Sequence, residues 1–205
     1  MMSDNDFDRA LGEVAAGRIV VLTGDRLRGG DIDFMVAARH ADAAAINFMA
    51  THGRGLICLA VTPQRAIRLG LTLVNAGTER QTGRPFARSI EAASGVSTGI
   101  SAADRARTVQ VAIGDNATSD DIVSPGHVFP LIAQAGGVLE RPAAVEASID
   151  LCRMAGAGDT AVICSILRDD GEMARIDDVG DLLRAHDLAV ADIGELMQRC
   201  GASAR

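Results

Sequence analysis

The chain has 205 residues, a formal net charge of -7 at pH 7 and 48% hydrophobic residues, which suits one globular domain with a sizeable core. The acidic balance, without any basic cluster, excludes a typical nucleic-acid binder, because such proteins neutralise phosphates with clustered basic side chains. All 20 Lys and Arg positions are arginine, which excludes Schiff-base and P-loop lysine chemistry.

The N-terminal segment and the cysteines indicate a cellular compartment. Residues 1–22 carry acidic side chains where a signal peptide would carry basic ones, and no apolar run reaches the ~20 residues of a membrane span. We therefore expect a cytoplasmic protein without a membrane partner. The four cysteines lie far apart in mostly apolar contexts, which favours reduced buried thiols over disulfides or structural zinc.

Hydrophobic periodicity and turn residues predict the elements of the first half of the chain. In chain order we expect a helix over 4–16, a strand over 18–22, a polar loop over 23–30, a helix over 32–51, a strand over 56–61 and a helix over 64–69 that starts after Pro63. Residues 71–85 are polar and irregular.

The second half alternates strands and helices in the same way. We expect a strand over 86–91, a tight loop over 95–99, a helix over 102–112 capped by Ser101, a helix over 145–154, a strand over 160–167, a helix over 177–186, a strand over 189–193 and a C-terminal helix. The pattern has no strict βαβ rhythm, no internal repeat and no linker. It predicts a single α+β or layered α/β domain over residues 1–205.

A glycine-rich loop after the first predicted strand is the first candidate site. Residues 24–31 contain two arginines and two aspartates, which could hold an anion and also present a carboxylate base. The same composition is typical of a solvated surface turn. Both interpretations remain open from the loop alone.

Three further residues and one tripeptide have a functional and a structural interpretation. Thr98, between two glycines and before a helix start, could bind a phosphate or belong to an ordinary helix cap. His127 lies in an apolar run, where a lone histidine is often a hydrogen-bonded core residue rather than a catalyst. Cys58 fits a buried thiol. Asp169-Asp170-Gly171 could bind a cation, but we favour a turn.

Six long segments of the chain, taken together, carry a specific pattern. They are INFMATHGRGLICLAVT at 46–62, RLGL at 68–71, GVSTGISAADRARTV at 95–109, PGHVFPLIAQAGGVLER at 125–141, EASIDLCRMAG at 146–156 and AVICSILRDDGEMAR at 161–175. In wording and order they resemble the 3,4-dihydroxy-2-butanone 4-phosphate synthase family of riboflavin biosynthesis, and the resemblance spans roughly residues 12–199.

The resemblance implies a fold, an assembly and a reaction. The fold would be a layered α/β/α sandwich, in a homodimer whose active site is near the subunit interface. The family's magnesium-dependent reaction converts ribulose 5-phosphate to dihydroxybutanone phosphate and formate. The residues that match its substrate-binding and catalytic positions are Arg26, Asp31, Cys58, Thr98, His127 and Arg141.

The chain departs from the family where the metal and the acid–base group would be. Leu27 stands at a family metal-ligand glutamate, Ala144 at the metal-binding histidine and Val145 at a phosphate-contacting threonine. Ser165 stands at the family's catalytic glutamate. Because Leu, Ala and Val cannot coordinate magnesium, we expect no metal cofactor.

We therefore expect a divergent enzyme that uses metal-independent acid–base chemistry on a small anionic metabolite, such as a sugar phosphate. Asp31 would be the base and His127 the partner acid, while Arg26 and Arg141 orient the anion. One alternative is a non-catalytic relative that pairs with itself or with an active paralogue. Another is a working synthase with relocated metal ligands such as Asp33, Glu140 or Glu146. Arg28 either enters the pocket in place of the lost metal charge or faces solvent.

Overall fold

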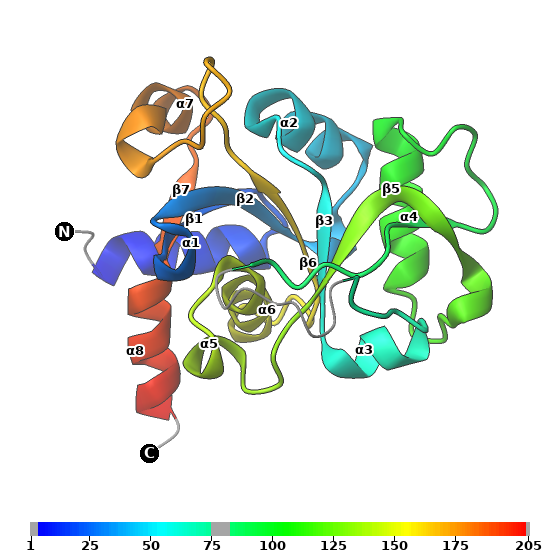
Figure 1. Cartoon of the computed structure of the whole chain (residues 1–205). Coiled ribbons are helices and arrows are strands. Elements are labelled where there is room, and N and C mark those ends of the chain that lie inside the picture. Colours follow the sequence, from blue (N-terminus) through cyan, green and yellow to red (C-terminus); the bar gives the residue numbers. More distant parts are fainter. Residues whose placement is uncertain (1–3, 75–82, 204–205) are drawn as a thin grey trace.

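A mixed β-sheet is the centre of the fold in residues 4–74 and 83–203, the parts of the chain that the computed structural model describes. Its seven strands have the order β4-β5-β3-β6-β2-β1-β7 (Figure 1). The strands are β1 (Val20–Asp25), β2 (Asp31–Ala37), β3 (Cys58–Val61), β4 (Ile90–Ala92), β5 (Ile122–Ile132), β6 (Ala161–Ser165) and β7 (Ala189–Asp192). β1 pairs in parallel with β7 and β3 with β5, and the other pairs are antiparallel.

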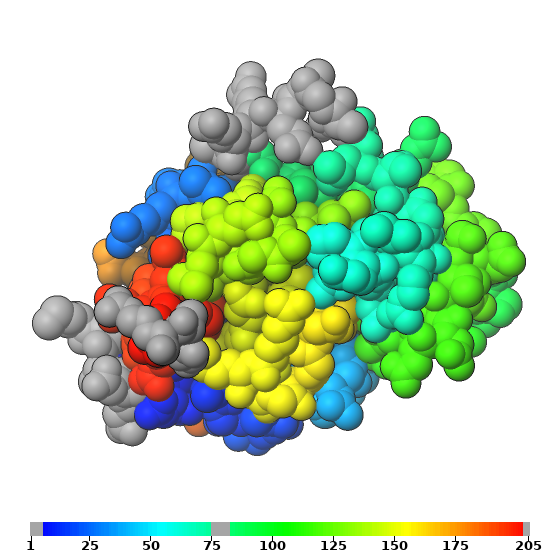
Figure 2. All heavy atoms as spheres, turned by 90° about the horizontal axis from the view of Figure 1, so that it is seen from below, coloured from blue at the N-terminus to red at the C-terminus, as the bar shows by residue number. Residues whose placement is uncertain are grey.

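Helices cover both faces of the sheet, which makes the α+β fold a three-layer sandwich. They are α1 (Asp4–Ala15), α2 (Ala43–Gly53), α3 (Pro63–Arg68), α4 (Ala102–Ala112), α5 (Gly137–Glu140), α6 (Ala144–Met154), α7 (Gly180–Ala185) and α8 (Ile193–Ser203). One core lies between the sheet and α1, α6 and α8, and the other between the sheet and α2 and α4. Seen from below, α8, α5, α6 and α3 follow one another across the surface (Figure 2).

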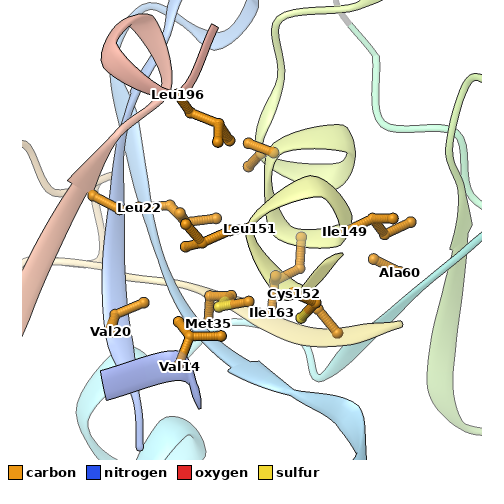
Figure 3. Packing of buried hydrophobic residues seen from close by; sticks show 14 of the residues in the cluster. Val14, Val20, Leu22, Met35, Ala60, Ile149, Leu151, Cys152, Ile163 and Leu196 are labelled. Carbon is orange, nitrogen blue, oxygen red and sulfur yellow. The ribbon is translucent and has the colours of Figure 1, made fainter. Parts of the chain in front are cut away.

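The first core is built from aliphatic side chains because the described chain offers few aromatic ones. Leu22, Met35 and Ile163 point from neighbouring strands toward Ile149 and Leu151 of α6 (Figure 3). Strand residues alternate between faces, so odd-numbered residues of β2 and β6 lie on the α6 side. Asp33 and Ser165, which pair in register, therefore lie on this side too.

Most expected elements are confirmed. The N-terminal helix, the strand before Thr62, the helix that begins at Pro63, the helix capped by Ser101 and the last helix–strand–helix series all form within a few residues of their expected bounds. The Ser101 side chain accepts a hydrogen bond from Asp104 N, as the capping pattern predicts. Residues 75–82 of the irregular segment lie outside the described residues.

Three expectations are wrong in part. The expected helix over 32–51 begins only at Ala43, because residues 31–37 form β2. Every residue of β2 is buried, and residues 34–37 are continuously apolar, so the polar–apolar alternation at residues 31–34 does not extend along the strand. β1 extends to Asp25 into the expected loop, and β4 begins only at Ile90.

The N-terminus of α6 is capped by a side chain from β1. Ala143, which precedes α6, has no side chain that could cap the helix, and the Asp25 carboxylate accepts a hydrogen bond from Ala144 N instead.

Within the described ranges, every helix is too short or too polar to cross a membrane.

Candidate functional site

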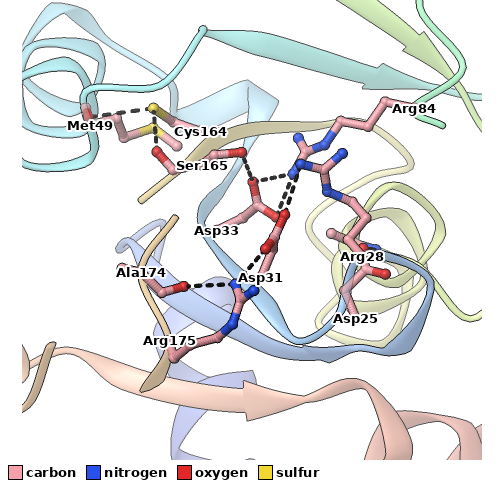
Figure 4. Close-up of polar contacts among 11 residues, drawn as sticks. Asp25, Arg28, Asp31, Asp33, Met49, Arg84, Cys164, Ser165, Ala174 and Arg175 are labelled. Atoms are coloured by element: carbon pink, nitrogen blue, oxygen red, sulfur yellow. Dashed lines mark hydrogen bonds and ion pairs between the residues drawn. The ribbon is translucent and has the colours of Figure 1, made fainter. Parts of the chain in front are cut away.

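Three aspartates gather where β1 and β2 meet, next to the start of α6. Asp25 pairs with Asp31 across the two strands, and Asp33 lies two residues further along β2. Their exposed fractions are 1%, 5% and 0%. A carboxylate removed from water must be paired or hydrogen-bonded. The partners of these three groups define the site (Figure 4).

Asp33 is held by Arg84 and Ser165. Arg84 Nη2 lies 2.5 and 2.7 Å from the two carboxylate oxygens, and Ser165 Oγ donates to Oδ1 at 2.9 Å. The Arg84 side chain is only 5% exposed. Burial alone would lower the pKa of Arg84, but the charge of Asp33 and its hydrogen bonds raise that pKa above its usual value. The Arg84 guanidinium therefore keeps its proton, and the ion pair is almost dry.

Cys58 lies beside the same guanidinium. Burial raises the pKa of Cys58 to about 12, against the opposing effect of the nearby Arg84 charge. The group is thus a neutral thiol at physiological pH, and a thiol is a much weaker nucleophile than a thiolate. Its contact with Arg84 suits packing and hydrogen bonding rather than nucleophilic attack.

Asp31 forms ion pairs with two arginines. Arg28 Nη2 lies 2.8 Å from Oδ2, and Arg175 Nη1 donates to Oδ1. The Arg28 side chain is 26% exposed and reaches the carboxylates from the same side as Arg84 (Figure 4). Of the two orientations that the sequence left open for Arg28, the inward one is observed. The Arg26 side chain belongs to an exposed residue and extends toward Gly194 at the start of α8.

Asp25 joins Leu27 and Ala144, the residues for which the sequence resemblance implies metal-ligand positions. Its Oδ1 accepts from Leu27 N at 3.1 Å and its Oδ2 from Ala144 N at 3.0 Å. Burial raises the pKa of Asp25, and the hydrogen bond from Ala144 opposes this rise. Val145 is buried next to Ala144 in the first turn of α6. Leu27 and Ala144 thus lie on either side of one carboxylate.

Arg141 connects α6 to the segment that carries Arg84. Its Nη1 lies 3.2 Å from Oε2 of the fully buried Glu146, and its Nη2 donates to the Gly83 carbonyl at 2.7 Å. Burial raises the pKa of Glu146, while the Gln134 amide and Arg141 oppose the rise. Arg141 is therefore engaged in holding the residue before Arg84.

His127 and Thr98 form a second group at the β4–β5 edge. His127 Nδ1 lies 3.0 Å from Glu91 Oε2, and a Cβ on Gly99, the neighbour of Thr98, would clash with Glu91. β3 and β6 lie between β5 and β2, so His127 and Asp31 are separated by three strand spacings, roughly 14 Å. Within one chain the structure does not bring the expected base and acid together.

Sequence reasoning named Asp33 only as a relocated metal ligand in one alternative, and it missed Arg84 as the partner of this carboxylate. The available signal was a carboxylate within the apolar run Ile32-Asp33-Phe34, which requires a buried cation once the run is read as a central strand. No comparable signal marks Arg84, because its pairing arises only from the tertiary fold.

The donor set at this point does not suit a divalent cation. Magnesium needs oxygen ligands in near-octahedral geometry, and Asp31 and Asp33 already accept from guanidinium groups. The residues present therefore do not fit a magnesium ion in this arrangement.

Comparisons with known proteins agree on one family. A sequence model of 3,4-dihydroxy-2-butanone 4-phosphate synthase matches residues 8–199. The curated synthase of Pseudomonas aeruginosa is 45% identical over 196 residues, which are 96% of this chain and 54% of that protein. The chain thus spans about half the length of the first curated relatives that it matches.

Solved structures agree with the sequence match. RibBX, a two-domain synthase from A. baumannii, superposes with a TM-score of 0.87 at 40% identity, over 93% of this chain and 56% of that one. A 3,4-dihydroxy-2-butanone 4-phosphate synthase in complex with two magnesium ions superposes with a TM-score of 0.89 at 30% identity, over 96% and 97% of the two chains.

The buried Asp33–Arg84 ion pair should contribute measurably to the stability of the protein. Either Asp33→Asn or Arg84→Met alone should lower the free energy of unfolding by roughly 3–5 kcal/mol, because each leaves a buried charge without its partner. The double variant should lose much less than the sum. Urea denaturation of the four proteins measures the coupling. The exposed pair Arg168–Asp170, changed in the same way, is the control and should show little coupling. Additive losses at Asp33 and Arg84 would contradict the interaction.

Proposed function

Because the chain belongs to the 3,4-dihydroxy-2-butanone 4-phosphate synthase family, we propose that it acts on a small anionic metabolite, such as a sugar phosphate, by acid–base chemistry without a bound metal. The observation that carries this proposal is the buried Asp33–Arg84 ion pair beside Leu27 and Ala144. It supports a site that operates with guanidinium charges instead of a divalent ion.

The arrangement has the groups that proton abstraction next to a carbonyl requires. Asp31, the least deeply buried of the three aspartates, would accept the proton from carbon. Negative charge then develops on the carbonyl oxygen, and guanidinium groups at Arg28 and Arg84 would stabilise it. Fixed N–H donors in a water-poor site do this without reorganisation. Enolisation, isomerisation and elimination all pass through such a charge.

A second candidate is the synthase reaction itself, in which ribulose 5-phosphate gives dihydroxybutanone phosphate and formate. It is favoured by 40–45% identity to proteins that carry the synthase name. Magnesium in that family would act as a Lewis acid for the enediolate. The donor set described above does not fit the ion, so no step of this chain's chemistry is assigned to it.

We also propose that the functional unit is a homodimer. His127 and Thr98 lie at the β4–β5 edge, apart from the aspartates, so a second copy could bring them to the site. An apolar groove of about 570 Å³ lies at this edge, and its lining includes Leu56, Val74 and Phe129. Leu56 and Val74 are 52% and 56% exposed, and such large exposed apolar residues favour burial against a partner.

One assay separates the catalytic proposals. Ketose phosphates, including ribulose 5-phosphate, are incubated with the protein in D₂O, and proton exchange and formate are followed by NMR with EDTA or with MgCl₂. We expect exchange that EDTA does not reduce, lowered about 10²–10⁴-fold by Asp31→Asn, because that change removes the base. Arg168→Met, at an exposed ion pair, is the matched control.

The other outcomes of this assay are equally informative. Formate release that requires magnesium would establish the synthase reaction instead. Ligand binding without exchange or formate would indicate a non-catalytic relative. In both cases the metal-free acid–base proposal is wrong.

The proposed homodimer is tested by measuring the mass of the protein in solution. Sedimentation equilibrium should give twice the 21.3 kDa of the chain, and Leu56→Glu should produce monomers because it places a charge in the apolar groove. Ile67→Glu, at an even more exposed apolar residue outside the groove, should remain dimeric. A wild-type protein that sediments as a monomer would refute the proposal.

A further inference from the structure

We propose that Arg84 is the resident cation of this site, a built-in positive charge that takes the place of a divalent ion among the three aspartates. The inference deepens the proposed function, since metal-free chemistry needs a fixed positive charge beside the developing negative one. It assigns to Arg84 a positioning role toward Asp33 and a role in excluding metal.

Burial distinguishes Arg84 from the other cations of the cluster. The side chain of Arg84 is 5% exposed, against 26% for Arg28 and 46% for Arg175. Water screens the charge of an exposed guanidinium, whereas a buried one acts at nearly full strength on its neighbours. A guanidinium also keeps its proton under all physiological conditions, unlike a lysine. Arg84 is therefore the permanent cation deep in the cluster.

The Arg84 segment is anchored on both sides. Gly83 O accepts from Arg141, and Pro85 O accepts from Ile132 N at 3.1 Å. Ala87 N in turn donates to Pro130 O at 2.9 Å. These bonds attach the segment to β5 and to Arg141, which follows α5. The guanidinium is thus presented to Asp33 by fixed backbone and not by a free surface loop.

Arg84 and a divalent ion exclude each other at this point. The electrostatic neighbours of Arg84 include Asp25 as well as Asp33, so its charge reaches the carboxylate that lies between Leu27 and Ala144. Two cations held a few ångströms apart repel each other by several kcal/mol even at an effective dielectric of ~20. Removal of Arg84 would release both oxygens of Asp33 from the guanidinium and leave them accessible to a hard cation, beside Asp25, Asp31 and the Ser165 hydroxyl.

Manganese binding tests this inference independently of turnover. Mn²⁺ alone is titrated against the full chain and followed by electron paramagnetic resonance. We expect no tight site in the wild type, but about one Mn²⁺ per chain in Arg84→Met, with a Kd at least ~10-fold lower than for the wild type, because carboxylate oxygens become available. Asp33→Asn combined with Arg84→Met should lose the gained site.

The matched control is Arg65→Met. Arg65 is also a buried arginine, but it donates to the carbonyls of Ala112 and Gly114 and not to a carboxylate. Its replacement should therefore create no manganese site. If Arg84→Met does not fold without metal, MnCl₂ should restore its thermal transition, and NaCl at equal ionic strength should not.

Three results would overturn the inference. The first is a wild-type Mn²⁺ site that Asp33→Asn abolishes. The second is a folded Arg84→Met protein that binds no Mn²⁺, and the third is an unfolded one that no divalent cation restores. None of these readouts depends on catalysis, so failure of the acid–base proposal alone would leave the role of Arg84 intact.

Discussion

The Asp33 carboxylate is wholly removed from water, and its ion pair with Arg84 is what makes that burial tolerable. The pair joins β2, in the middle of the sheet, to a segment 51 residues further along the chain. Ser165 donates the remaining hydrogen bond from β6. Loss of either charge would leave the other one buried without a partner. The pair therefore constrains the relative positions of β2, β6 and the segment that carries Arg84.

This constraint connects the helix layer to the site. Asp25 caps α6 from across the chain, and Arg141, which is paired with Glu146 of α6, holds the carbonyl of Gly83. The same helix packs its apolar face into the core between the sheet and α1. The position of the guanidinium therefore depends on the packing of α6 as well as on its own segment. A protein with this fold can in this way have a positive charge at its site that comes from an arginine side chain.

Periodicity and capping signals predicted most elements because local chemistry determines them. Pro63 after Thr62, and Ser101 before an acidic residue, identified helix starts that form as expected. β2 was missed because its second half, residues 34–37, is continuously apolar, and periodicity alone does not distinguish such a run from part of a buried helix. The family resemblance located Leu27 and the other replaced positions, but it could not show where the compensating charge comes from, since Arg84 reaches Asp33 only through tertiary folding.

The most direct test of a resident arginine cation is diffraction from crystals soaked in MnCl₂, with data collected at the manganese absorption edge. The account predicts clear density for Arg84 on Asp33 and no anomalous peak among the three aspartates. A manganese peak coordinated by Asp33, with the Arg84 side chain displaced, would contradict it. That result would restore a metal-dependent reaction to this site.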